Sequence, residues 1–166
     1  MKNILVIDQA TINTAYTVIS IEDGVPKWKL CSLVKLHGSK EVRFRIHHLY
    51  NILTQVIKEN NIDTLVIEEV IMTKSKNWSA TSVLLELRGV MELMSVQYNL
   101  QLYVMNIVNW KHTAGIKTTT RDKQKAESIK LALKRFSVYK DIIVGSDDVS
   151  DALNMSYAFL KNEKII

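Results

Sequence analysis

Two short apolar runs with nearly the same sequence constrain the fold of this chain most. They are Leu5-Val6-Ile7-Asp8 and Leu65-Val66-Ile67-Glu68, and each ends in a carboxylate. Short runs rich in branched apolar residues predict buried strands. A charge at the end of a buried strand costs free energy unless something compensates it. We therefore expect two strands that carry their carboxylates for a chemical purpose.

The order of the other elements predicts how the two runs come together. We predict strands over residues 3–8, 11–21, 28–36, 63–70 and 102–105, and helices over 40–60, 79–98, 122–136 and 147–161. Asp23-Gly24-Val25-Pro26 predicts the turn between the second and third strands. Because a helix joins the first and fourth strands, we expect these two to be parallel. The order predicts an α/β fold with a mixed sheet, three antiparallel strands and then parallel strands, flanked by helices.

A second pair of carboxylates stands at the start of the last predicted helix. Asp148 and Asp151 are three residues apart, so a helix places them on one face. Docking that face at the carboxyl edge of the sheet would bring them to Asp8 and Glu68. Like charges so close need a cation, and oxygen donors suit Mg²⁺ or Mn²⁺. Two such ions could bind the attacking water and the leaving 3′-oxygen of a phosphodiester.

Plainer readings exist for each carboxylate. An aspartate at a strand end is often only a turn former, and one at a helix start only an N-cap. Glu69 and Asp147 are neighbouring competitors. We prefer Glu68 because it repeats the register of the first run, and a slip of one residue turns a side chain to the opposite face. We prefer Asp148 because Asp147 lies off the face that carries Asp151.

Charge gives a further indication of the substrate. The net charge is +5 and the isoelectric point about 9.2. Between Trp110 and Arg135 there are eight basic residues and two acidic ones. Such a local excess is what phosphate backbones need, although a solvated helix face is the alternative. In a basic chain, the acidic cluster suggests metal-assisted cutting of nucleic acid.

Length and composition bound the remaining possibilities. The 166 residues suit a single domain over 1–166. No apolar run is long enough to cross a membrane, and the amino-terminal residues lack the features of a signal peptide. The lone Cys31 fits a reducing cytosol, so we expect a cytoplasmic protein.

Several strings together resemble those of the RuvC-type Holliday-junction resolvases, and more closely the bacteriophage members of that group. The strings are Ile7-Asp8, Val66-Ile67-Glu68-Glu69-Val70, Leu87-Arg88-Gly89-Val90 and Asp148-Val149-Ser150-Asp151-Ala152-Leu153. The resemblance implies an RNase H-like fold, a homodimer, and nicking of two strands of a four-way junction with Mg²⁺ or Mn²⁺. It assigns catalysis to the acidic tetrad and to Lys111, with Lys125 or Lys123 as a further basic residue.

The chain departs from the bacterial pattern in two places. Gln9-Ala10 follows the first aspartate where bacterial members usually have Pro-Gly, and Ile71 stands in the place of an aromatic residue set against junction bases. Trp78 could stack on a base instead, or could pack on the next helix. The expected DNA contacts are Lys74, Lys76, Trp78, Lys111, Lys117, Arg121, Lys123 and Lys125, although Lys74 and Lys76 also suit a plain solvated loop.

The sequence therefore predicts a metal-dependent endonuclease that resolves Holliday junctions and other branched DNA by paired nicking. The helix over 79–98 is apolar on more than one face, which suits either a second subunit or a central core position. The alternatives are a broader RNase H-like nuclease for forks, flaps or hybrids, and a non-catalytic binder of branched DNA. An actin-like phosphotransferase is disfavoured because no glycine-rich loop follows Asp8. Whether a branch-migration motor of the host cooperates stays open.

Overall fold

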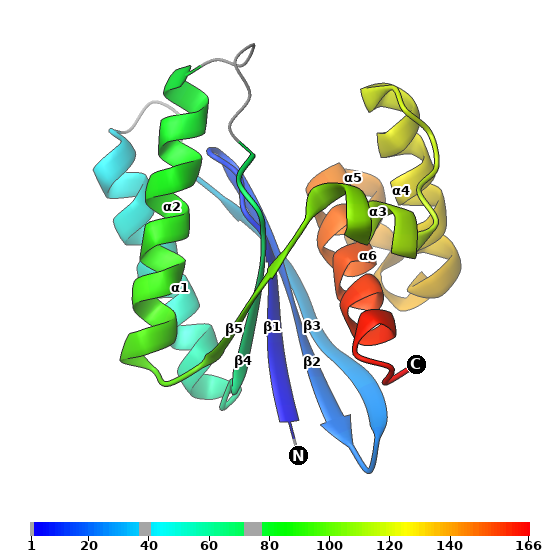
Figure 1. Cartoon of the computed structure of the whole chain (residues 1–166), viewed down its shortest axis with the longest axis horizontal. Helices are drawn as coiled ribbons and strands as arrows, with labels where there is room; N and C mark the ends of the chain where they lie inside the picture. Colours follow the sequence, from blue (N-terminus) through cyan, green and yellow to red (C-terminus); the bar gives the residue numbers. More distant parts are fainter. Residues whose placement is uncertain (1, 37–40, 72–77) are drawn as a thin grey trace.

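A five-stranded mixed sheet forms the centre of the protein, with helices on both faces (Figure 1). The computed structural model describes residues 2–36, 41–71 and 78–166. The strands are β1 (Lys2–Asp8), β2 (Asn13–Glu22), β3 (Val25–Lys35), β4 (Thr64–Glu68) and β5 (Gln101–Met105), in the order β3-β2-β1-β4-β5. β1 pairs with β2 antiparallel and with β4 parallel. The predicted mixed sheet and the predicted parallel pair are both confirmed.

The helices divide into two groups, one on each face of the sheet (Figure 1). One group contains α1 (Val42–Glu59) and α2 (Trp78–Gln97). The other contains α3 (Ile107–Ala114), α4 (Arg121–Arg135), the 3₁₀ turn η1 (Ser137–Tyr139), α5 (Lys140–Gly145) and α6 (Asp147–Asn162). None of the helices in the described parts of the chain is long and apolar enough to cross a membrane.

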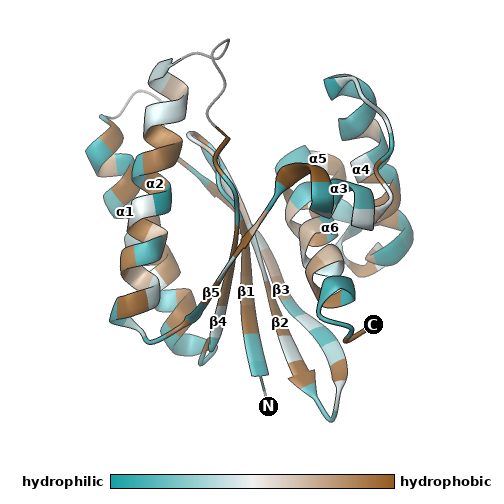
Figure 2. Cartoon of the chain, in the orientation of Figure 1, coloured by the Kyte–Doolittle hydropathy of each residue, from teal (hydrophilic) through white to brown (hydrophobic). Residues whose placement is uncertain are grey.

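Burial on both faces of the sheet explains why the central strands are continuous runs of apolar residues. In β1, Leu5 and Ile7 belong to the core beneath α1 and α2. Ile4 and Val6 point the other way and pack with residues of α3 and α6. The apolar residues of the central strands accordingly lie between the two helical layers, and Figure 2 shows hydrophilic colour over much of α4. This alternation also decides which way the residues after each strand point.

The hairpin between β2 and β3 is tighter than predicted. Only Asp23 and Gly24 form the turn, and both have positive φ, 52° and 79°. Two left-handed residues in succession match the twist of the flanking strands in a two-residue hairpin. The assignment of Val25 and Pro26 to the turn was wrong, because both belong to β3. Proline is tolerated there because β3 is an edge strand.

Other predicted boundaries need smaller corrections. β4 ends at Glu68, short of the predicted residue 70, and β2 begins at Asn13 rather than at residue 11. Residues 137–145 received no assignment from the sequence, yet they form η1 and α5. That segment is short and without a clear apolar period, so pattern alone gives no sign of it.

Candidate active site

Asp8 and Glu68 meet at the carboxyl ends of two neighbouring parallel strands. Ile7 lies opposite Ile67 in the register of β1 and β4, so the two acidic residues follow at adjacent positions. Val6 and Val66 both face the α3 and α6 side of the sheet. Because side chains alternate along a strand, Asp8 and Glu68 emerge on that same side. The matching register is thus what aims both carboxylates at α6.

α6 completes an acidic cleft with its amino-terminal end. The helix begins at Asp147 and packs against β1 and β2. Its first two turns carry Asp148 and Asp151, which lie in one cavity of about 300 Å³ with the carboxylates of the two strands. The residues lining this cavity, called here the acidic cleft, are Asp8, Ala10, Glu68, Lys111, Arg121, Gln124, Lys125, Asp147, Asp148 and Asp151.

Burial, and after it the crowding of like charges, raises the pKa values of three carboxylates of the acidic cleft. Burial raises the pKa of Asp8 well above its usual range, and repulsion from Glu68, Asp151 and Asp148 adds to the shift. Burial is also the largest cause of the raised pKa values of Asp148 and Asp151. Lys111 acts in the opposite direction on Asp8 and Asp151. A cluster of carboxylates held against this repulsion is typical of a functional site.

Two buried donors orient carboxylates of the acidic cleft. The indole Nε1 of Trp110 donates to Oε1 of Glu68 at 2.7 Å, and the Trp110 side chain is 1% exposed. The hydroxyl of Ser128, on α4, donates to Oδ1 of Asp151. Sequence reasoning named neither donor. The sign for Trp110 was its indole N–H, which needs a partner wherever the ring is buried.

Two of the three basic residues of the acidic cleft, Lys111 and Lys125, are already engaged with neighbours. Lys111 Nζ donates to Oε1 of Gln124 at 3.3 Å. Lys125 forms an ion pair with Asp147, which raises the pKa of the lysine and lowers that of the aspartate. Asp147, set aside in favour of Asp148, therefore also lines the cleft and holds a lysine there.

Three other predicted residues that the structure describes do not line the acidic cleft. Lys117 and Lys123 are exposed and do not line it, although Lys123 lies on the same helix as Lys125. Trp78 is the first residue of α2 and is 68% exposed, so it does not pack away against a neighbouring helix. Lys74 and Lys76 lie outside the described residues. Glu69 points elsewhere, because its Oε2 accepts from Nδ2 of Asn106 at 2.7 Å.

The donor chemistry of the acidic cleft fits a hard divalent cation. The four carboxylates of the predicted tetrad offer oxygen ligands, which Mg²⁺ and Mn²⁺ prefer. Across residues 2–36, 41–71 and 78–166, however, no three acidic, histidine or cysteine side chains are placed to hold one ion together. Repulsion among carboxylates opposes the close approach that shared coordination needs. The cleft thus has the ligand type, with its side chains further apart than a metal centre requires.

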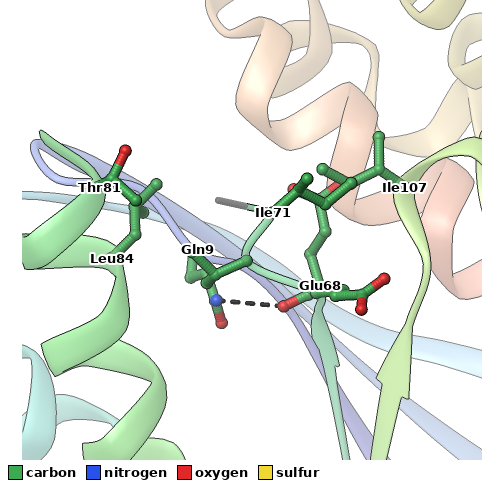
Figure 3. Close-up of a pocket in the computed structure, with 8 residues that line it drawn as sticks. Gln9, Glu68, Ile71, Thr81, Leu84 and Ile107 are labelled. Carbon is green, nitrogen blue, oxygen red and sulfur yellow. Dashed lines mark hydrogen bonds between the residues drawn. The ribbon is translucent and has the colours of Figure 1, made fainter. Parts of the chain in front are cut away.

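A second cavity, also of about 300 Å³, shares Glu68 with the acidic cleft and is drawn in Figure 3. Its lining residues, which define the side pocket, are Gln9, Glu68, Glu69, Val70, Ile71, Thr81, Leu84 and Ile107. Gln9 is 6% exposed, and its Nε2 donates to the main-chain oxygen of Glu68 at 3.2 Å. Its Oε1 is buried with no hydrogen-bond partner among the described residues. Leaving such an acceptor unpaired costs about 1–3 kcal/mol.

Comparison with known proteins gives a family match over most of the chain. The profile of the family described as crossover junction endodeoxyribonuclease RuvC matches residues 4–158. No curated protein sequence matches the chain.

Solved structures resemble the whole molecule. Thermus thermophilus RuvC in complex with a Holliday junction substrate has a TM-score of 0.72 at 12% identity, covering 98% of this chain and 96% of that one. The fowlpox virus Holliday junction resolvase has a TM-score of 0.69 at 16% identity, with 97% and 99% covered. The yeast mitochondrial Holliday junction resolvase has a TM-score of 0.69 at 11% identity, with 99% and 80% covered. These likenesses confirm the expected RNase H-like fold.

Proposed function

The chain belongs to the RuvC family of crossover junction endodeoxyribonucleases, and from this membership we propose that its acidic cleft is where DNA is cut. As a member of this family, the protein is a junction-resolving nuclease that acts on branched DNA. The single observation that carries the proposal for the cleft is the meeting of Asp8, Glu68, Asp148 and Asp151 in one cavity lined by basic side chains.

Nucleases of this family depend in general on divalent metals. We assign the holding of Mg²⁺ or Mn²⁺, two ions per site, to Asp8, Glu68, Asp148 and Asp151. The chemistry that such ions supply when bound is a lowered pKa of water and neutralised charge on the phosphate. Trp110 and Ser128 keep two of the carboxylates oriented, as the hydrogen-bonding partners of metal ligands do.

The basic side chains of the cleft would hold the scissile phosphate. Lys111 already offsets the charge of Asp8 and Asp151, so it is suited to stabilise negative charge that grows on the phosphate in the transition state. Lys125 would exchange Asp147 for a phosphate oxygen, because both are anionic oxygen partners. Arg121 lines the same cavity and would hold a neighbouring phosphate.

Positions beyond the cleft would hold the arms of the junction. Lys117 and Lys123 are exposed at the α4 side of the cleft and would contact phosphates, as would Lys74 and Lys76. Trp78 presents an exposed ring at the start of α2 and would stack on a base. These contacts would be sequence-tolerant, because phosphates and stacked rings are common to all DNA.

We also propose a homodimer, because paired nicks in a four-way junction need two sites related by a two-fold axis. The outer surface of α1 and α2 suits the contact. A shallow groove of about 340 Å³ lies there, with Leu93 61% exposed at its edge and Val96 80% exposed further along α2. Exposed apolar patches of this kind mark contact surfaces.

The dimer contact is testable with a charge in the groove. Leu93→Glu should turn a dimer into a monomer in light-scattering measurements, whereas Val138→Glu, at another exposed apolar residue, should not. A Leu93→Glu protein that stays dimeric would place the contact on another face.

Three expectations from the sequence stand as proposals alongside these. They are one domain over residues 1–166, a greater likeness to the bacteriophage members of the family, and a cytoplasmic location. Each follows from length, composition or resemblance rather than from the geometry of the cleft.

The decisive experiment for the cleft is cutting of a synthetic four-way junction with Mg²⁺. Wild type should make symmetric paired nicks, while Asp8→Asn and Asp151→Asn should bind the junction without cutting it. Asp141→Asn, which makes the same change at an exposed aspartate of α5, should cut like wild type. Cutting by either cleft variant at the wild-type rate would disprove the tetrad. Equal cutting of forks, flaps and RNA–DNA hybrids would indicate the broader nuclease, and binding without cutting by wild type a non-catalytic binder.

A further inference from the structure

The side pocket lies directly beside the acidic cleft, and Glu68 lines both. Figure 3 shows Thr81 and Leu84 of α2 on one side, Ile71 and Ile107 on the other, and Gln9 between them. Because the two cavities share a wall, a nucleotide with its phosphate in the cleft has the side pocket within reach of its base. The volume of about 300 Å³ falls at the small end of ligand sites.

The amide of Gln9 is held in one orientation. Its Nε2 donates to the main-chain oxygen of Glu68, and a carbonyl oxygen only accepts hydrogen bonds. A flipped amide would set two oxygens against each other, so Oε1 must be the free end. That oxygen is buried and has no partner among the described residues. A buried acceptor of this kind needs an explanation, and a ligand that donates to it is one.

The other features of the side pocket narrow the class of ligand. Val70, Ile71, Leu84 and Ile107 supply apolar walls, which suit the flat faces of an aromatic ring. The charged residues that line it are Glu68 and Glu69, whose oxygens accept hydrogen bonds and do not donate them. The pocket therefore favours a flat ring whose edge carries donors. Among nucleobases, an exocyclic amino group is such an edge.

We propose that the side pocket receives an unpaired nucleobase with an exocyclic amino group, next to the phosphate that is cut, and that Gln9 Oε1 accepts from this group. The proposal rests on the proposed function, because it places the phosphate in the acidic cleft. Extruding a base costs least where it is already unpaired, and a branch point interrupts pairing and stacking. Gln9 is then a residue that determines which nucleotide lies at the cut.

The first test compares two junctions that differ by one amino group. One carries adenine beside the nicked phosphate, and the other carries purine, which is adenine without its amino group. Wild type should cut the adenine junction between about twofold and tenfold faster, which is the value of one neutral hydrogen bond. Equal rates for the two junctions would overturn the proposal.

The second test removes the acceptor. Gln9→Met keeps the length of the side chain without the oxygen, so the preference for adenine over purine should fall to about one. Thr64→Val is the matched control, because Thr64 Oγ1 is another buried oxygen without a partner among the described residues and lies at the opposite end of β4. The control should keep the wild-type preference. A Gln9→Met protein that keeps it would refute the assignment, provided that its circular dichroism spectrum is that of the folded protein.

Binding separates this inference from the proposed function. If wild type cut no junction, the proposed function would fail while the pocket stayed testable. Junctions with 2-aminopurine at the branch point should gain fluorescence on binding wild type, because the base leaves the stack, and should gain much less with Gln9→Met. The same gain with both proteins, or no gain with wild type, would overturn the side pocket as a base site.

Discussion

Trp110 is the single residue on which the position of Glu68 depends most visibly. Trp110 belongs to α3, and its indole lies in the core that α3 and α6 form against the sheet. The indole donates to the carboxylate of Glu68 at 2.7 Å. Trp110→Phe keeps an aromatic ring in the core and removes the donor. Loss of a hydrogen-bonding partner of a metal ligand typically costs about 10–100-fold in metal affinity or activity. We expect slower junction cutting that higher Mg²⁺ partly restores.

The measurement is the cutting rate across a series of Mg²⁺ concentrations. Trp28→Phe is the matched control, because Trp28 donates in the same way to Ser156 outside the acidic cleft. The control should cut like wild type. If Trp110→Phe cut like wild type at every Mg²⁺ concentration, the role of the indole would be packing alone.

Asp8 should lower the stability of the protein in the absence of metal. Its pKa is raised in the folded state by burial and by the neighbouring carboxylates. A group of this kind favours folding below its unfolded pKa of about 3.9, and the benefit is lost as pH rises through the folded pKa. Wild type with a chelator should therefore lose stability between acidic and neutral pH.

Asp8→Asn removes this charge, so its stability should depend less on pH. At pH 7 with a chelator it should unfold roughly 2–4 °C higher than wild type, equivalent to about 1 kcal/mol for a chain of this size. Thermal unfolding followed by circular dichroism measures the difference. Asp141→Asn, at an exposed position, should change nothing. A destabilised Asp8→Asn protein would mean that the carboxylate contributes more by hydrogen bonding than it costs by repulsion.

The two halves of the candidate site differ in how far sequence reveals them. The positions of Asp8 and Glu68 can be predicted from the local sequence, because the alternation of side chains along a strand fixes where each one points. The hydrogen bonds of Trp110 to Glu68 and of Ser128 to Asp151 join residues 42 and 23 positions apart. No local pattern encodes such a pair, because each depends on how whole helices dock on the sheet. For the same reason, the sequence gives no sign that Gln9 Oε1 lacks a hydrogen-bond partner among the described residues.

At the level of elements, a buried polar network fixes α6 against α4. Asn154 is fully buried, and its Nδ2 donates to the main-chain oxygen of Ser128 at 2.8 Å and to its hydroxyl at 3.0 Å. Its Oδ1 accepts from Arg135 at 2.8 Å. Ser128 in turn donates to Asp151. The side chain of Ser128 therefore links the docking of α6 on α4 to the position of the Asp151 carboxylate.

Asn154→Leu should break that link. The change leaves the Ser128 carbonyl and the Arg135 guanidinium without their partner, which we expect to cost about 2–4 kcal/mol of unfolding free energy. Urea denaturation measures the loss. Asn162→Leu, at the exposed end of the same helix, should stay within about 0.5 kcal/mol of wild type. Equal stability of the two variants would show that α6 is held by apolar packing alone.

The elements that sequence predicts well are those with a clear period. The central strands and the long helices were predicted to within a few residues, because burial imposes a clear pattern of apolar residues on their sequences. α5 has six residues and was missed, since its position depends on packing beside α4 and α6. The β2–β3 turn was drawn too long because Pro26 reads as a loop residue, whereas an edge strand accepts it.

On the scale of the whole molecule, several basic residues lie in and beside the acidic cleft. α4 carries Lys123 and Lys125 at its amino-terminal end, close to the α6 carboxylates. Replacing both with Gln should weaken junction binding and reduce its salt dependence. The slope of log affinity against log salt should fall by about two, since each lost phosphate contact is worth about 0.9.

The control for this prediction uses two lysines far from the cleft. Lys27 and Lys29 lie on β3 near the β2–β3 turn, at the end of the sheet away from α4 (Figure 1), and are about half exposed. Replacing both with Gln removes the same total charge and should leave the slope nearly unchanged. Equal slopes for the two double variants would indicate that binding responds to net charge and not to α4.

The order of the elements along the chain bears on when the protein becomes able to cut. Asp8 and Glu68 belong to strands that are made early, whereas Asp148 and Asp151 belong to α6, which follows every strand of the sheet. A chain that has been made only as far as α5 therefore holds half of the carboxylates of the proposed tetrad. If the proposed tetrad is the active site, we expect cutting to begin only after α6 has been made, and a chain that stops before α6 should not cut.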